Sequence, residues 1–178
     1  SADPALTSLT LVTTCLAAAA GGIGAALFSG ILYKNLDLTM FMNGVLGGLV
    51  GITAGADQML PGSAILIGLF AGVIVVLSVA LLDKCKLDDP VGAIPVHLFC
   101  GIWGTLAVGI FGELAGFQQF MVQLACVGIA GLFCVIGATV ITLLVKGIVG
   151  LRVDEKEEAE GLDIAEHGTG AYGDFSIR

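Results

Sequence analysis

The stretch FMVQLACVGIAGLFCVIGATVITLLVKGIVGL, residues 120–151, runs for 32 residues with one charged side chain, Lys146, close to its end. A membrane hydrocarbon core of about 30 Å needs about 20 residues of helix, so this stretch is longer than one crossing requires. As a helix it would be about 48 Å long and must tilt or extend into water. Because spanning segments must pair their own backbone groups, the sequence predicts a membrane helix here.

Four further apolar stretches precede it, over residues 5–33, 38–56, 61–82 and 91–112, and none contains Asp, Glu, Lys or Arg. Only 12% of the chain is charged, whereas soluble domains carry about 25%. The sequence therefore predicts an all-α membrane protein in which residues 1–152 form a bundle of five transmembrane helices.

The net charge of −8 is concentrated at one end of the chain. Residues 153–178 hold eight of the fifteen acidic residues, which are Asp154, Glu155, Glu157, Glu158, Glu160, Asp163, Glu166 and Asp174. We therefore expect an acidic tail over residues 153–178 and no nucleic-acid partner. A solvated terminus is the simplest interpretation of such a charge run.

The basic residues indicate how the chain is oriented. If the five stretches cross a membrane in turn, all seven Lys and Arg side chains fall on one side: Lys34, Lys84, Lys86, Lys146, Arg152, Lys156 and Arg178. Short loops rich in Lys and Arg stay in the cytoplasm, so we expect a cytoplasmic C-terminus and an external N-terminus.

Glycine is abundant within the apolar stretches. Gly44 with Gly48 and Gly47 with Gly51 form two overlapping GxxxG pairs. Small residues four apart let helix backbones approach closely, so these pairs predict tight helix packing rather than a phosphate-binding loop.

One ionisable residue, His97, lies inside the predicted membrane helices. Counting eight residues from Asp89 at about 1.5 Å each places His97 about 12 Å into the membrane. An ionisable side chain at such depth by default marks an ion or proton path. A neutral imidazole accepts one hydrogen bond and donates another, so His97 can receive a proton from a cation and pass it on.

Other roles remain open for His97 and its neighbours. His97 can simply bond a neighbouring helix, or bind a metal or haem with Cys100, although no other His or carboxylate lies at its depth. The five cysteines form no CxxC pair, and no carboxylate accompanies His97 as an enzyme would need. We therefore expect no enzyme, cofactor or metal site.

Asp88 and Asp89 precede Pro90 and are expected to cap a helix. Their carboxylates can also attract a cation.

Three motifs resemble the ammonium transporter (Amt/Rh) family. Asp88-Asp89 followed by Val96-His97-Leu-Phe-Cys100-Gly-Ile resembles its penultimate core helix, and residues 43–56 resemble its eighth helix. Residues 150–153, 160–168 and 171–172 resemble its cytoplasmic tail. The resemblance covers nearly the whole chain and implies helices seven to eleven plus the tail of an eleven-helix inverted-repeat fold.

The resemblance implies ammonium/ammonia transport through a hydrophobic pore lined by two histidines. His97 matches the second histidine, and the first would belong to the N-terminal half of the transporter. Ile94 matches a hydrophobic pore-lining position, and Asp89 matches an acid of the inner vestibule. The family pattern has a further Asp where this chain has Gly92.

The resemblance also implies partners and a location. It implies a homotrimer in a cell (inner or plasma) membrane whose tail meets a PII-type signalling protein, with Gly161 and Asp163 shaping that tail. An ammonium sensor of the same fold, coupled to cytoplasmic signalling, is the alternative function. A stand-alone five-helix structural protein is a third hypothesis, and it predicts an initiator Met near Ser1.

Overall fold

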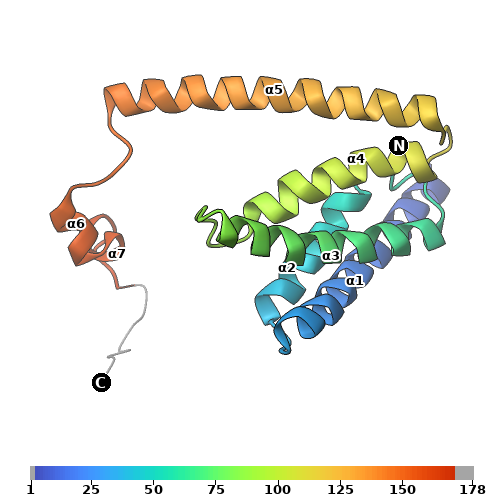
Figure 1. Ribbon diagram of the computed structural model, residues 1–178, viewed down its shortest axis with the longest axis horizontal. Coiled ribbons are helices and arrows are strands. Elements are labelled where there is room, and N and C mark those ends of the chain that lie inside the picture. Colours follow the sequence, from blue (N-terminus) through green and yellow to red (C-terminus); the bar gives the residue numbers. More distant parts are fainter. Residues whose placement is uncertain (1–2, 171–178) are drawn as a thin grey trace. The chain divides into compact units, whose positions relative to one another are not determined.

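The computed structural model describes residues 3–170, and these form helices joined by short connections, with no strand among them (Figure 1). The elements are α1 (Pro4–Tyr33), α2 (Leu38–Ile52), α3 (Pro61–Lys84), the π-helix η1 (Ile94–Phe99), α4 (Cys100–Phe111), α5 (Phe117–Ile148), α6 (Glu155–Glu160) and α7 (Leu162–Ala165). The predicted all-α fold class is confirmed. Arg178 and the rest of residues 171–178 of the expected tail lie outside the described residues.

Aspartates before the first two helices explain where those helices begin. Asp3 accepts a hydrogen bond from the backbone N–H of Ala5 at 2.9 Å, and Asp37 accepts one from Met40 at 3.0 Å. Each carboxylate satisfies a donor that has no partner within the helix, and its charge suits the positive end of the helix dipole.

The second apolar stretch is shorter as a helix than the sequence indicates. α2 ends at Ile52, and the chain continues through turns as far as Gln58. Its 15 residues span about 22 Å, less than a hydrocarbon core of about 30 Å. Among the described residues, four helical segments are long and apolar enough to cross a membrane, namely Pro4–Tyr33, Pro61–Lys84, Ile94–Phe111 and Phe117–Ile148. The described residues thus hold five apolar helices, of which the second ends at Ile52 and is shorter than the stretch 38–56.

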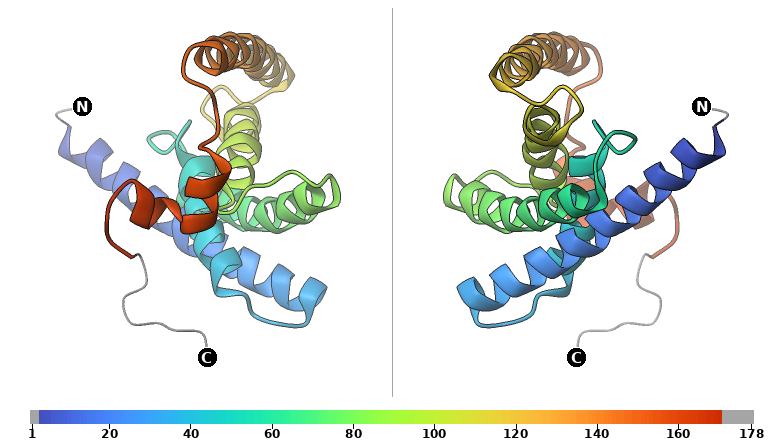
Figure 2. Two further views of the ribbon diagram at one scale, coloured as in Figure 1. Left: turned by 90° about the vertical axis from the view of Figure 1, so that its left-hand side faces the viewer. Right: turned by 90° about the vertical axis from the view of Figure 1, so that its right-hand side faces the viewer.

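Helices α1, α2 and α3 pack against one another at glycine contacts (Figure 2). A Cβ atom on Gly44 of α2 would lie 2.6 Å from the carbonyl oxygen of Gly21 on α1. A Cβ atom on Gly24 would lie 2.6 Å from the carbonyl oxygen of Leu69 on α3. Only glycine allows this approach, so the close packing expected of the GxxxG pairs is confirmed.

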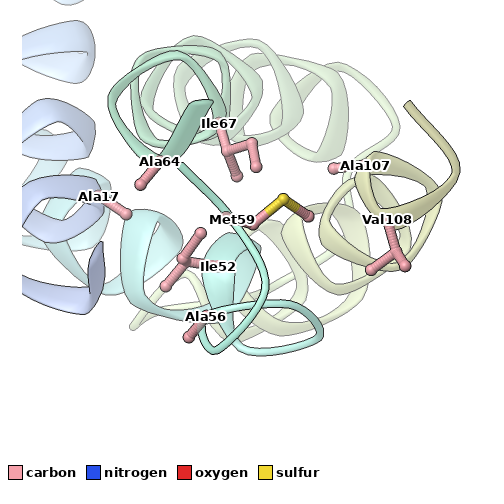
Figure 3. Packing of buried hydrophobic residues seen from close by; sticks show 8 residues of the cluster. All are labelled: Ala17, Ile52, Ala56, Met59, Ala64, Ile67, Ala107 and Val108. Carbon is pink, nitrogen blue, oxygen red and sulfur yellow. The ribbon is translucent and has the colours of Figure 1, made fainter. Parts of the chain in front are cut away.

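A buried hydrophobic cluster joins the ends of α2, α3 and α4 (Figure 3). Met59, which follows the α2 turns, lies at its centre, with Ile52 and Ile67 on one side and Ala107 and Val108 on the other. The flexible thioether fills the space between the three helices. This cluster fixes α4, which continues directly from η1.

The chain divides into two compact units, residues 1–130 and residues 131–178, and the boundary falls within α5. No residue of α5 is buried, although the helix is apolar on all sides. An apolar surface all round a helix is typical of a segment surrounded by lipid or by other helices. In the second unit, Asp154 caps α6 by accepting from the N–H of Glu157 at 2.8 Å.

Candidate functional site

The segment that carries His97 begins at a turn held by Asp89. Asp89 Oδ1 accepts from the backbone N–H of Ala93 at 2.9 Å, and Oδ2 accepts from that of Ile94 at 2.8 Å. Pro95 has no N–H, and the N–H of Val96 donates to the carbonyl of Gly92 at 3.2 Å. The N–H groups of Ala93, Ile94 and Val96 are therefore bonded inside this short segment.

Residues Ile94–Phe99 form a π-helix, which the sequence analysis did not anticipate. The N–H of Cys100 donates to the carbonyls of Pro95 and His97. π-helical turns are rare and occur frequently at functional sites. Because residues 89–92 form a turn, only the four steps from Ala93 to His97 are helical, about 6 Å at the α-helical rise. The chain from Asp89 to His97 is therefore not the continuous helix that the 12 Å value assumes.

The π-helix separates a packed face from an open one. Pro95, Val96 and Cys100 are buried, and Val96 and Cys100 join a cluster with Ala71 and Val75 of α3. His97 is exposed, and Ile94 is half-buried. The imidazole of His97 therefore lies on the exposed face of an apolar helix whose opposite face packs against α3.

The structure separates His97 from Cys100. The Cys100 thiol is buried and lies 3.5 Å from the carbonyl oxygen of Ala71, whereas His97 is exposed. No group of three or more His, Cys, Asp or Glu side chains with a metal-binding arrangement occurs within residues 3–170. The contacts of Cys100 are those of a packing residue.

Asp89 is half-buried and uses both oxygens as caps. A carboxylate offers about four lone-pair sites, so these two bonds leave acceptor capacity. A cavity of about 20 Å³ lies beside it, lined by Asp83, Gly92 and Pro95 among others. This space accommodates about one water molecule. The structure thus gives Asp89 a capping role and brings it together with Ile94, while Asp88 is exposed.

The predicted tail residues Gly161 and Asp163 lie at the junction of α6 and α7. Gly161 has φ +97°, and a Cβ atom there would lie 2.8 Å from Asp163 Oδ1. The N–H of Thr169 donates to the carbonyl of Asp163 at 3.2 Å. Glycine is required at this sharp junction, because other residues rarely adopt such a φ.

Sequence reasoning missed Asn43, which contacts the His97 segment. Its side chain is only 7% exposed, and Nδ2 donates to the carbonyl of Val91 at 3.1 Å. The available signal was an amide side chain in an apolar stretch, because such a group must find a hydrogen-bond partner when buried.

A sequence model described as Ammonium Transporter Family matches residues 1–172. The chain belongs to the ammonium transporter family. Ammonium transporter Amt2 of Archaeoglobus fulgidus is 38% identical, with the match covering 94% of this chain and 40% of that protein. Ammonium transporter Amt2 of Methanocaldococcus jannaschii is 37% identical, with corresponding shares of 97% and 41%. The chain therefore spans about two fifths of the length of these curated relatives.

Two solved structures share the fold of this chain. A structure named Sensor Amt Protein superposes with a TM-score of 0.87 at 32% identity, covering 92% of this chain and 43% of that one. Saccharomyces cerevisiae Mep2 superposes with a TM-score of 0.78 at 24% identity, covering 85% and 38%. Family membership and the apolar helices together identify a multi-pass membrane protein.

Proposed function

We propose that this chain forms one wall of an ammonium/ammonia conduction pore in which His97 is the central polar group. The observation that carries the proposal is the exposed imidazole on a helix whose opposite face is packed. An exposed imidazole flanked by apolar residues needs a further polar partner to remain solvated in a membrane. The relatives, which are named ammonium transporters, support ammonium as the substrate.

The mechanism follows from the cost of moving a charge. A bare ammonium ion enters an apolar pore only at a large desolvation cost, whereas neutral ammonia does not carry that cost. The cation therefore gives its proton to water at the mouth. Ammonia then passes Ile94 and His97 and takes up a proton from water on the other side. The imidazole of His97 accepts a hydrogen bond with one nitrogen and donates one with the other, and a second histidine from the N-terminal half completes the pair.

Asp89 has two functions in this proposal. It caps the helix that carries His97, and its remaining lone pairs attract a cation at the inner mouth. The one-sided distribution of Lys and Arg supports a cytoplasmic position for this mouth and for the acidic tail.

Assembly and regulation belong to the same proposal. α5 has no buried residue, which supports its being covered by lipid, by the N-terminal half and by other subunits of a homotrimer in the inner or plasma membrane. The tail, with Gly161 and Asp163 at its sharp junction, is the segment that a PII-type signalling protein contacts.

The test is ammonium flux in vesicles that contain the assembled transporter. An inward ammonium gradient should raise the internal pH or produce a current, and a potassium gradient should produce neither. His97→Ala should abolish the response or remove the selectivity against potassium. The matched control is His167→Ala, because His167 is the other histidine and is exposed in the tail.

Intact mass should be measured on the same sample. The chain alone has a mass of 18.0 kDa, so a complete pore requires a heavier species or a second chain. Ammonium flux that is unchanged in His97→Ala would remove His97 from the mechanism and refute the proposal.

An ammonium sensor is the second candidate, because the structure named Sensor Amt Protein matches 92% of this chain with a TM-score of 0.87. A sensor binds ammonium and changes the tail without sustained flux. Ammonium-dependent changes in hydrogen exchange within residues 152–170, in vesicles that show no flux, would favour it.

A further inference from the structure

We propose that Asn43 is a positioning residue that holds the turn before η1 and thereby fixes the orientation of His97. The importance of this role for transport rests on the proposed function, whereas the positioning itself does not. Three observations support it: the contact made by Asn43, the backbone at Gly92, and the hydrogen bonds that lead from this turn to His97.

Asn43 connects α2 to a segment 48 residues away in the sequence. Its Nδ2 donates to the carbonyl of Val91 at 3.1 Å, and its side chain is 7% exposed. A buried amide without a partner is costly, so this bond ties the turn to α2 at one defined place. The Val91 side chain is 69% exposed, so its own packing does little to anchor the turn.

Gly92 is shaped to receive the Asn43 amide. Its φ is +74°, and a Cβ atom would lie 2.5 Å from Asn43 Nδ2 and 3.3 Å from Asn43 Cγ. Any larger residue would face both a strained backbone and a clash with the amide. The two residues therefore fit each other, and each limits what can replace the other.

The turn leads directly to His97 through the backbone. The N–H of Gly92 donates to the carbonyl of Asp89, and the carbonyl of Gly92 accepts from Val96, both at 3.2 Å. The Asp89 carboxylate caps Ala93 and Ile94 from the same turn. If Val91 is released, these bonds lose their fixed geometry and η1 can adopt the α-helical register. His97 would then project from the helix in a different direction.

A purely structural bond of the same kind exists elsewhere and provides a matched control. Thr13 is fully buried, and its Oγ1 donates to the carbonyl of Ala56 at 2.6 Å, joining α1 to the turns that follow α2. Asn43→Ala and Thr13→Ala each delete one side-chain to backbone bond between distant segments. Only the first touches the His97 turn.

The experiment is NMR of the full chain, labelled at histidine, in lipid nanodiscs. The chain has two histidines, and His167→Gln assigns their side-chain signals. Asn43→Ala should shift or split the His97 signal, and the amides of Ala93 and Ile94 should exchange at least about fivefold faster, the factor that losing one ordinary hydrogen bond implies. Thr13→Ala should leave the His97 signal and both amides unchanged.

Two further variants keep the test decisive if Asn43→Ala does not fold. Asn43→Asp retains the shape but removes the N–H donor, and Gly92→Ala disturbs the same contact from the other side. Both should reproduce the change at His97. An unchanged His97 signal in the folded variants, or an equal change in Thr13→Ala, would overturn the inference. Because this readout needs no transport, a failed flux experiment would refute the proposed function alone.

Discussion

The carboxylate of Asp89 accepts a hydrogen bond from the backbone N–H of Ile94 at 2.8 Å, and so joins two residues that our proposal assigns to the pore. The bond crosses five positions of the chain and closes the turn before the π-helix. Asp89 therefore fixes where that helix begins, at Ile94, and the helix ends at Phe99. A negative charge at this position can stabilise the start of the helix and can also attract a cation.

Asp89 variants should separate capping from charge. Asp89→Ala removes both acceptors and should lower the free energy of unfolding by about 1–2 kcal/mol. Asp89→Asn keeps one acceptor oxygen without the charge, so it should lose less stability. If the charge also attracts ammonium, Asp89→Asn should still reduce flux at low ammonium concentration. Thermal unfolding in detergent and flux in vesicles measure the two effects.

Asp88→Asn is the control for Asp89, because Asp88 is an adjacent carboxylate that is exposed. It removes the same charge without removing either bond to Ala93 or Ile94. Equal stability in wild type and Asp89→Ala would show that the two caps contribute nothing.

Glycine contacts predict a contrast between two equally conservative substitutions. In Gly24→Ala the new methyl would lie 2.6 Å from the carbonyl oxygen of Leu69, so overpacking should cost about 1–3 kcal/mol. In Gly128→Ala the methyl of α5 meets nothing within 4 Å, so the higher helix propensity of Ala should raise stability by up to about 1 kcal/mol. Thermal unfolding of the isolated chain tests both, and a loss of stability in Gly128→Ala would contradict the open environment of α5.

The sequence was a good guide to the apolar helices and to the all-α fold class. Each membrane stretch lacks acidic residues, and hydropathy alone locates such segments because the bilayer excludes unpaired polar groups. Capping by Asp89 was predicted from its position before Pro90, but the helix begins at Ile94, and Pro90 lies in the turn before it. These features depend on neighbouring residues and need no knowledge of distant contacts.

The sequence was a poor guide to backbone register and to contacts between distant segments. The turns after Ile52 have the same apolar, small-residue composition as the helix before them, so hydropathy extended α2 too far. A π-helix differs from an α-helix only in which carbonyl oxygen each N–H bonds, and the amino-acid composition does not determine this hydrogen-bond register. The bond between Asn43 and Val91 joins residues 48 positions apart, so no local pattern could reveal it.

The contact between Phe70 and Trp103 provides an optical measure of how α3 and α4 pack. The two rings meet edge to face with centroids 5.6 Å apart, and Trp103 Nε1 donates to the carbonyl of Ile67 at 3.0 Å. Phe70→Leu should alter the emission of Trp103, the single tryptophan, and lower stability by about 1 kcal/mol. Phe117→Leu is the control, because Phe117 is 82% exposed. Unchanged emission in Phe70→Leu would show that the rings do not interact.

The start of the tail predicts a difference between a cap and a surface ion pair. Asp154→Ala removes the acceptor for the N–H of Glu157 at 2.8 Å and should destabilise the six-residue α6 by about 1 kcal/mol. Arg152 pairs with Glu158, but the two side chains are 77% and 52% exposed, so Arg152→Ala should cost less than about 1 kcal/mol and nothing at high salt. Amide exchange at Glu157 measures both effects. Asp154→Asn should restore protection because it keeps the acceptor oxygen, and a larger loss in Arg152→Ala than in Asp154→Ala would refute this ranking.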